Sequence, residues 1–393
     1  MTALRAPRID AAWLRDTLVR LLQTPTGVPA GQTDVEPGDA RIAEAVDRVV
    51  VPRLASLEPD ELRRHALGDV AARFGPRRDD GILVQTYIVS QHGNLMDDAV
   101  TGRIVDGDAL GLDGRCAVGQ GANQNKGPMA AVFAAVQLMR RDLRRPVWIA
   151  VNTEGRSSHG GSRRIIDDLD VTAAYGIVSI GTDLAVSLGN RGRVDARVTV
   201  AGRSSHSSQP WLGSNPIEGA ADVVTALRSV PLPPDHPDLG PASATPYRLT
   251  CAPIAPHTIP SEAVVVVDRR LLPGEEPADA VATVREHLDA AVAAPITVEQ
   301  GAVMLPAAVS ATSPHVTALR AAVDEVGDRT SPTVWSRNTF DAGYACARGI
   351  PTIMFGPGRR DFGAGVTDTE AVALDDCVTA ARALQRTFEQ VCG

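Results

Sequence analysis

The segment PMAAVFAAVQLMRRDLRRPVWIAV, residues 128–151, decides the fold class, because it passes from a predicted helix into a predicted strand. Residues 128–143 carry apolar side chains at helical spacing, and residues 147–151 form a short apolar run. Apolar strands of the same kind are predicted at 82–89 and at 175–180. This alternation of strands and helices predicts an α/β fold, in which a mostly parallel sheet is covered by helices.

The pattern changes on both sides of this segment. Two helices are predicted before it, at 10–22 and 39–54. After about residue 188 come an alternating strand at 194–200, a helix at 215–228, a Pro-rich connection, a strand at 263–270 and a helix at 278–293. A helix at 314–326, a strand at 352–355 and a helix at 374–391 then restore the α/β pattern. We therefore expect residues 1–188 and 301–393 to form one discontinuous domain, with an α+β domain inserted at 189–300.

The composition is that of an ordinary globular protein, with 44% hydrophobic and 22% charged residues. The formal net charge of -8 is spread along the chain, which predicts no nucleic-acid partner. No run approaches the roughly 20 apolar residues of a membrane span, and the N-terminus shows no signal-peptide core, so we expect a cytoplasmic protein without a membrane partner. The five cysteines show no CxxC or CxxH pairing, which argues against a thiolate zinc site or a disulfide framework.

Short motifs recur along nearly the whole chain. In order, they are SQHGN at 90–94, GANQNKG at 121–127, GRSSHSS at 202–208, GSNPI at 213–217, DRRLLPG at 268–274, DAG at 341–343, GIP at 349–351 and FGPG at 355–358. With this order and spacing, the chain resembles the zinc-dependent amidohydrolase and peptidase family of acetylornithine deacetylase, succinyl-diaminopimelate desuccinylase and carboxypeptidase G. The resemblance implies an amidase-type catalytic domain and an inserted ferredoxin-like domain, which serves as a lid and forms a homodimer.

The first two motifs fall on metal-binding positions of the family. The resemblance places His92 on a metal ligand, and it places Gln124 where the family has an Asp that bridges two zinc ions. Asn94 stands where an Asp orients the catalytic base. An amide has no anionic oxygen to neutralise a pair of dications. The resemblance therefore implies a divergent member that lacks most of its metal ligands.

The remaining ligand positions lead to the same expectation. The family's Glu-Glu pair falls at 152–156, where Glu154 occupies the ligand position with Thr153 in place of the base, or else the pair falls on Gly155 and Arg156. The next ligand falls near residue 180, with Asp183 as the nearest acid. The last, a His, falls near residue 366, in a segment without histidine that precedes the matched Glu370. Because a catalytic zinc needs about three protein ligands, we expect no bound metal and no cofactor.

Other site residues of the family are present. His206 matches the His that reaches across the dimer to polarise the scissile carbonyl, and Arg270 matches the Arg that pairs with a substrate carboxylate. Asn215 begins a predicted helix, so it either caps that helix or contacts the substrate. His257 stands where the family often has an Asn near the substrate.

Several polar residues that are unusual for the family occur among these motifs, which indicates a hydrogen-bonding pocket in place of an ionic cage. They include Gln91, Asn94, Asn123, Gln124, Asn125, Thr153, Arg156, Ser157, Ser158, His159, Arg337 and Asn338. Lys126 and Asp341 are either members of structural ion pairs or direct participants. We predict that the catalytic residues are Glu154, His206 and His92, and that the substrate-binding residues are Arg270, Asn215, Asn94, Gln124, Asn125, His257 and Asn338.

The leading hypothesis is a metal-independent enzyme that acts on an amide or activated acyl group of a small, carboxylate-bearing amino-acid derivative. The reaction would be hydrolysis, acyl transfer or a lyase step, with Arg270 as the anchor, His206 as the donor to the carbonyl and Glu154 as the base. One alternative is a non-catalytic ligand-binding or partner protein that keeps the family cleft. Another is a mononuclear-metal hydrolase that uses His92, Glu154 and Asp183.

Overall fold

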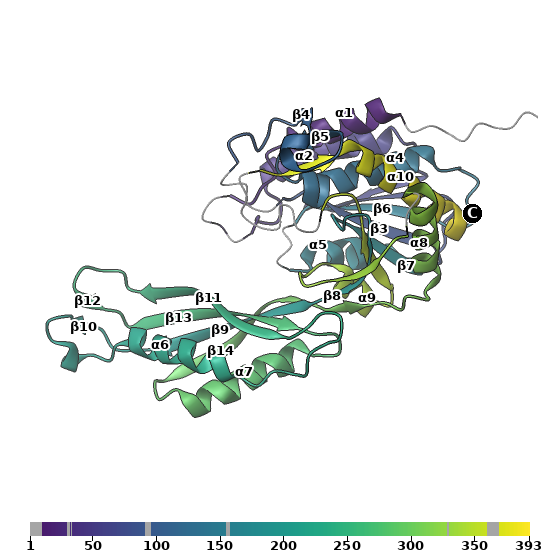
Figure 1. Ribbon diagram of the computed structural model, residues 1–393. Coiled ribbons are helices and arrows are strands. Elements are labelled where there is room, and N and C mark those ends of the chain that lie inside the picture. Colours follow the sequence, from purple (N-terminus) through teal and green to yellow (C-terminus); the bar gives the residue numbers. More distant parts are fainter. Residues whose placement is uncertain are drawn as a thin grey trace, which may run out of the picture. The chain divides into compact units, whose positions relative to one another are not determined.

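The computed structural model describes residues 10–29, 32, 34–90, 96–154, 158–327, 330–359 and 369–393. Two compact units make up the chain (Figure 1). The first contains Met1–Gly189, Ala307–Trp335 and Asp341–Gly393, and the second contains Asn190–Pro306 and Ser336–Phe340. The second unit extends past the expected boundary at residue 300 and takes in a short segment, 336–340, that the sequence pattern had placed in the first domain.

A nine-stranded sheet lies at the centre of the first unit, in the order β1-β2-β6-β3-β7-β17-β8-β15, with β16 paired to β8. Strands β6, β3, β7 and β17 run parallel to one another, whereas β1 and β2 pair in antiparallel fashion. The strands are β1 (Glu61–Arg64), β2 (Val70–Phe74), β3 (Ile82–Tyr87), β6 (Val147–Asn152), β7 (Tyr175–Ser179), β8 (Val186–Asn190), β15 (Ala307–Ala308), β16 (Thr333–Ser336) and β17 (Thr352–Phe355). The predicted α/β class is confirmed.

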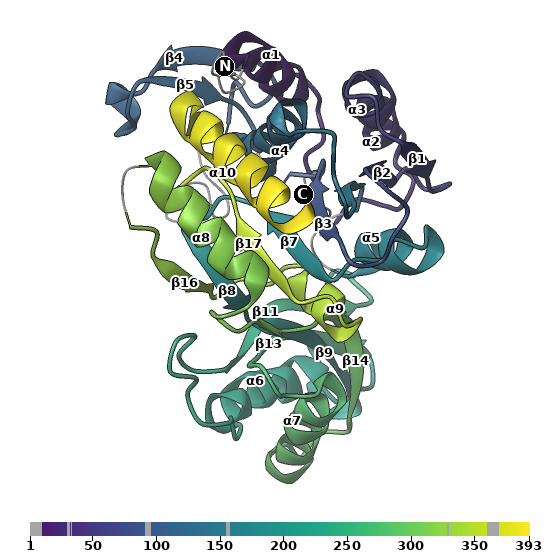
Figure 2. The same ribbon diagram turned by 90° about the vertical axis from the view of Figure 1, so that its right-hand side faces the viewer.

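Strand side chains point alternately to the two faces of this sheet, so both faces are apolar, and helices cover each of them. Along β6, Val147, Ile149 and Val151 belong to the larger core. Trp148 and Ala150 belong to a second core on the opposite face. Figure 2 shows α4, α8 and α10 together on one face of the sheet, and α10 packs against both of the others. The helices of this unit are α1 (Ala11–Leu22), α2 (Ala40–Ala45), α3 (Val51–Ala55), α4 (Gly127–Leu138), α5 (Gly160–Arg163), α8 (Pro314–Gly327), α9 (Ala342–Ala347) and α10 (Leu374–Cys392).

A small second sheet in the same unit was not predicted. Its order is β18-β5-β4, formed by β4 (Arg103–Asp106), β5 (Arg115–Val118) and β18 (Ala371–Ala373). The pairing of β18 with β5 brings the residues just before α10 next to the turn that opens α4. No helix in the described part of the chain is long and apolar enough to cross a membrane.

The second unit is a four-stranded antiparallel sheet in the order β11-β13-β9-β14, with two helices on one face. Val194, Val198 and Val200 alternate along β9 and pack in the core beneath those helices. A separate pair of two-residue strands, β10 and β12, extends from the sheet. The elements are β9 (Gly192–Ala201), β10 (Ser205–His206), α6 (Pro216–Ala226), β11 (Ser243–Ala252), β12 (Thr258–Ile259), β13 (Glu262–Leu271), α7 (Pro277–Ala291) and β14 (Ile296–Met304).

Candidate active site

The carboxyl ends of the parallel strands bring the family motifs of the first unit together. Tyr87 ends β3 and lies in register with Asn152, which ends β6. Asp341 joins them at the start of α9, because its backbone N–H donates to Tyr87 Oη at 3.3 Å and Asn152 Nδ2 donates to its Oδ2 at 3.4 Å. Ligands of open α/β sheets bind at this edge, so these side chains mark the candidate site.

The GANQNKG segment forms a tight turn at the same edge. Gly121 has a φ of 85°, and a Cβ there would lie 2.4 Å from Ser90 Oγ, so only glycine fits. Asn125 Nδ2 donates to the carbonyls of Tyr87 (2.9 Å) and Val89 (3.2 Å). The amide of Asn125, a predicted substrate-binding residue, therefore fastens the turn to the end of β3.

Glu370 holds this turn from the other side. Its buried carboxylate accepts the backbone N–H groups of Gly121 (2.8 Å), Asn123 (3.0 Å) and Gln124 (3.0 Å). Burial raises the pKa of Glu370, although these N–H groups and Lys126 oppose the shift. The acid that the resemblance matched to the last metal motif thus satisfies backbone donors. The carbonyl of Gln124 accepts the N–H of Gly181, just past the end of β7, at 3.3 Å.

Lys126 is fully buried beneath the turn. Its Nζ donates to the carbonyl of Thr24 at 3.0 Å. Burial lowers the pKa of Lys126 to about 7, with Glu370 opposing the shift. The side chain therefore ties the turn to the segment that follows α1.

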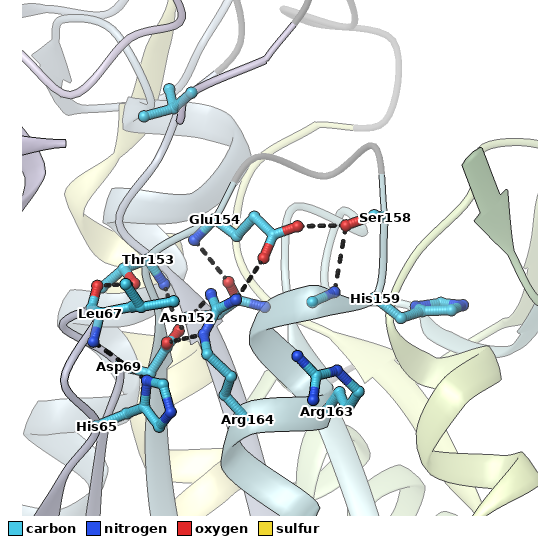
Figure 3. A network of polar contacts seen from close by, with 12 residues as sticks. His65, Leu67, Asp69, Asn152, Thr153, Glu154, Ser158, His159, Arg163 and Arg164 are labelled. Carbon is cyan, nitrogen blue, oxygen red and sulfur yellow. Dashed lines mark hydrogen bonds and ion pairs between the residues drawn. The ribbon is translucent and has the colours of Figure 1, made fainter. Parts of the chain in front are cut away.

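Glu154 belongs to a buried ion-pair network just after β6 (Figure 3). Its Oε2 lies 2.8 Å from Nη1 of Arg164, and its Oε1 accepts the hydroxyl of Ser158. Arg164 also pairs with the buried Asp69. Both carboxylate oxygens of the predicted base are thus occupied by donors of the protein itself, and the charge is compensated.

Two adjacent glycines make room for this network. A Cβ on Gly160 would lie 2.0 Å from Glu154 Oε2, and a Cβ on Gly161 would lie 2.0 Å from Asn152 Oδ1. Asn152 Oδ1 in turn accepts the backbone N–H of Glu154 at 2.8 Å. The start of α5 can therefore press against the end of β6 only because these positions lack side chains.

His159 and Asp341 form a second pair at this edge. His159 Nδ1 lies 2.7 Å from Asp341 Oδ1, and the carboxylate is almost completely buried. An acid in this position fixes the orientation of the imidazole. In Figure 3 the imidazole points away from the Glu154 carboxylate. Both residues were expected in the pocket, but their pairing was not predictable, since nothing in their spacing signals the contact.

The described residues do not assemble a zinc site. Among them, no group of three or more His, Cys, Asp or Glu side chains could hold a metal ion. His92, Asn94 and Gln91 lie outside the described residues, as do Arg156, Ser157 and the segment around residue 366. Asp183 is described, and its backbone N–H donates to the carbonyl of Gly358 at 2.8 Å.

The predicted site residues of the second unit fall into two groups. His206 lies on β10 and His257 precedes β12, so strand pairing brings their rings to 6.1 Å between centroids. His206 Nδ1 lies 2.8 Å from Ser208 Oγ. Asn215 caps α6, because its Oδ1 accepts the N–H of Ile217 at 3.1 Å and its Nδ2 donates to Glu218 at 3.1 Å. A substrate contact by Asn215 stays a prediction.

Arg270 lies at the other end of the same sheet. Register pairs it with Arg193 near the start of β9, whereas Glu262 pairs with Ala201 at the end of β9, next to β10. The eight-residue separation along β13 corresponds to roughly 27 Å. Asp268 engages the Nε and Nη2 of Arg270 at 2.7 and 2.9 Å. Asn338, in the segment 336–340, is exposed, and its N–H donates to Ser336 Oγ. Within one chain, His206 and Arg270 are therefore too far apart to contact the same small molecule.

Comparisons with known proteins agree with this architecture. A peptidase dimerisation domain of the M20 type matches residues 188–294. The chain is 27% identical to acetylornithine deacetylase of Aliivibrio salmonicida over 113 residues, 28% of this chain and 30% of that protein. It is 24% identical over 275 residues, 70% of this chain and 74% of the other, to a protein of Pyrobaculum aerophilum named as a hydrolase of LysW-lysine and LysW-ornithine.

A solved structure extends the likeness to the whole fold. The M20 family metallo-carboxypeptidase of Sulfolobus solfataricus superposes with a TM-score of 0.75 at 16% identity, over 96% of this chain and 99% of the other. The comparisons thus define a protein with an amidohydrolase and peptidase fold. More particularly, residues 188–294 match the dimerisation domain of M20 peptidases, and the resemblance drawn from the motifs is confirmed.

Proposed function

We propose that the protein is a metal-independent M20 enzyme that acts on an amide or activated acyl group of a small, carboxylate-bearing amino-acid derivative. The main support is that both acids retained near the metal motifs, Glu154 and Glu370, already bind donor groups of the protein itself. Glu154 is compensated by Arg164 and Ser158, and Glu370 accepts three backbone N–H groups. Gln124 stands at the bridging position and supplies no charge. This donor set favours a polar pocket over a pair of dications.

The reaction class follows from the lost Lewis acid. Without zinc, a bound water keeps its high pKa, so hydrolysis of an unactivated peptide is slow. An activated acyl substrate, transfer of the acyl group to an amine, or a lyase step makes smaller demands on the base. His206, as an N–H donor to the developing negative charge on the carbonyl oxygen, supplies stabilisation in each of these reactions.

The active assembly is a homodimer in this proposal. His206 and Arg270 lie at opposite ends of one sheet, so a single small substrate can meet both only if they come from different chains. The M20-type dimerisation domain matched at residues 188–294 supports such an arrangement. The same domain also exposes several large apolar side chains: Trp211, Leu212, Ile217, Leu232, Tyr247, Leu249 and Ile254.

Two groups at the sheet edge qualify as the base. Glu154 was the sequence-based choice, but its oxygens already accept from Arg164 and Ser158. His159 has the orientation by Asp341 that general-base histidines have in other hydrolases. The ion pair between Glu154 and Arg164 also fits the alternative of a non-catalytic binding protein, because a cleft that only binds a ligand needs no base.

The deciding experiment combines metal analysis with turnover. Purified protein should contain less than about one zinc per chain, and its melting temperature should be unchanged in EDTA. A panel of N-acyl amino acids and activated esters should yield a substrate whose turnover survives the chelator. Two zinc ions per chain, or turnover that EDTA abolishes and zinc restores, would overturn metal independence. Saturable binding of these compounds without turnover would favour the binding protein.

A further inference from the structure

Three arginines gather at one end of the sheet in the second unit. Arg191 immediately precedes β9, whose first residue, Gly192, pairs with Leu271 at the end of β13. Arg270 is in register with Arg193, two residues further along β9, and is therefore the diagonal neighbour of Arg191 across the sheet. Arg337 arrives from the segment 336–340, which is fastened here by the bond from Arg191 N to the carbonyl of Ser336 at 3.1 Å. The chain thus brings a distant segment to this end of the sheet, and with it a third guanidinium.

Two of these guanidinium groups come close together beside Gly240. A Cβ placed on Gly240, which has a φ of 71°, would lie 3.6 Å from Arg191 Nη2 and 3.9 Å from Arg337 Nη2. Arg191 Nη2 donates to the carbonyl of Leu239, and its Nε has no acceptor among the described residues. Because both Nη2 atoms lie within 4 Å of the same point, the two guanidinium charges repel each other unless an anion lies between them.

The charges at this end are only partly compensated. Asp268 holds Arg270 through its Nε and Nη2, which leaves the end-on edge of that guanidinium available. Arg337 is exposed and makes no hydrogen bond or ion pair with the described part of the chain. Burial, followed by Arg337 and Arg270, lowers the pKa of Arg191, and only the exposed Asp235 opposes them. A single substrate carboxylate bound to Arg270 would therefore leave the charges of Arg191 and Arg337 uncompensated.

We infer that Arg191 and Arg337 form an anion site beside Arg270, so that the substrate carries two acidic groups. One carboxylate meets the open edge of Arg270, and the second group, a carboxylate or a phosphate, lies between Arg191 and Arg337. Guanidinium pairs suit both anions because each presents parallel N–H donors to two oxygens. The inference rests on the proposed function for the identity of the ligand, but anion binding itself is measurable without turnover.

The test compares anions of one and two charged groups. At constant ionic strength, thermal unfolding of the full chain is followed while sodium glutarate, sodium butyrate or inorganic phosphate is titrated. Glutarate should bind at least roughly ten-fold more tightly than butyrate, since charge-assisted hydrogen bonds contribute about 1.5 to 3 kcal/mol. Stabilisation by phosphate alone would assign the second group as a phosphate. Equal affinity for glutarate and butyrate, with no effect of phosphate, would overturn the site.

A matched pair of variants locates the effect. Arg337→Gln should remove the preference for the dianion without lowering the unliganded melting temperature, because Arg337 makes no hydrogen bond or ion pair in the described part of the chain and its charge repels that of Arg191. Arg228→Gln makes the same charge change on an exposed residue after α6 and should keep the preference. An Arg337→Gln protein that still prefers glutarate would sink the proposal. Dianion binding without turnover of any substrate would instead leave this site standing and remove the proposed enzyme.

Discussion

Glu154 and His159 differ in what surrounds them, although both lie just after β6. The Glu154 carboxylate is held by Arg164 and Ser158, and that arrangement resembles a structural ion pair. His159 is held on one side of its ring by Asp341. A base needs an atom that is open to accept a proton, and both oxygens of Glu154 already accept hydrogen bonds. Single substitutions separate the two roles.

Glu154→Gln should act mainly on stability. It leaves Arg164 paired only with Asp69, so the free energy of unfolding should fall by about 2 kcal/mol. His159→Asn should lower kcat by roughly 100-fold or more and remove the acidic limb of the pH profile. Urea unfolding and the pH dependence of kcat/KM measure both effects. The reverse pattern, in which Glu154→Gln removes the limb, would restore Glu154 as the base.

His315 predicts a pH dependence of stability that is independent of the site. It is fully buried in α8, its ring stacks on Tyr175 at 4.7 Å, and burial lowers its pKa to about 4. In the unfolded chain the pKa is about 6.5. Below pH ~6.5 the His315 side chain becomes protonated in the unfolded chain but stays neutral in the folded protein. The free energy of unfolding therefore decreases as the pH falls towards 4, by about 3 kcal/mol in total.

Urea unfolding between pH 7 and 4 measures this loss. His315→Phe keeps an aromatic ring against Tyr175 and should flatten the pH dependence over that range. His287→Gln, on the half-exposed side of α7, serves as the control and should keep the slope. Identical slopes in all three proteins would show that His315 titrates normally.

At the scale of elements, some parts of the fold could be predicted and others could not. Elements α4 and β6 were predicted as apolar runs, and both are buried on nearly all sides. The helix ends at Leu138 and not at residue 143, since Met139 adopts an extended conformation. Strand β11 was missed: it contains Pro246, is mostly exposed, and therefore shows no apolar alternation.

The candidate site was predictable to a similar degree. Motif order located the turn at 121–127 and the residues around Glu154, because their backbone geometry depends on local glycines. The partners Arg164 for Glu154, and Asp341 for His159, were not predictable, since the folded sheet alone brings them together. Arg337 was expected among the polar residues of the pocket, but its place beside Arg191 and Arg270 was not predictable, because the three residues come from separate segments.

The junction between β6 and α5 carries an element-scale prediction. Gly161→Ala places a methyl group against Asn152, which is fixed by its bonds to Glu154 N and Asp341, so it should cost about 1 to 3 kcal/mol of stability. Gly160→Ala places a methyl group against the Glu154 carboxylate, which Arg164 and Ser158 hold, so it should cost a similar amount. Chemical denaturation of the two variants measures the losses. Unchanged stability in either variant would mean that the side chain facing the new methyl group can move aside.

For the whole molecule, the separation of His206 and Arg270 leads to a complementation test. His206→Ala and Arg270→Ala proteins should each be nearly inactive as homodimers. When they are mixed, unfolded and refolded together, about half of the dimers are mixed, and each contains one site with both residues intact. Roughly a quarter of the parent activity should return. The absence of any recovery, with mixed dimers verified by mass spectrometry, would mean that both residues serve the same chain's site.

The position of β17 in the sheet has a consequence for how the protein is made. This strand lies between β7 and β8, yet it is encoded after the whole second unit. A ribosome therefore releases β7 with one edge unpaired and completes residues 190–306 before the missing neighbour, Thr352–Phe355, is synthesised. Nascent first units expose an apolar strand edge throughout that interval, which invites pairing with other chains. Translation speed across the inserted unit, and chaperones that cover the open edge, then decide how much of the newly made protein reaches the folded state.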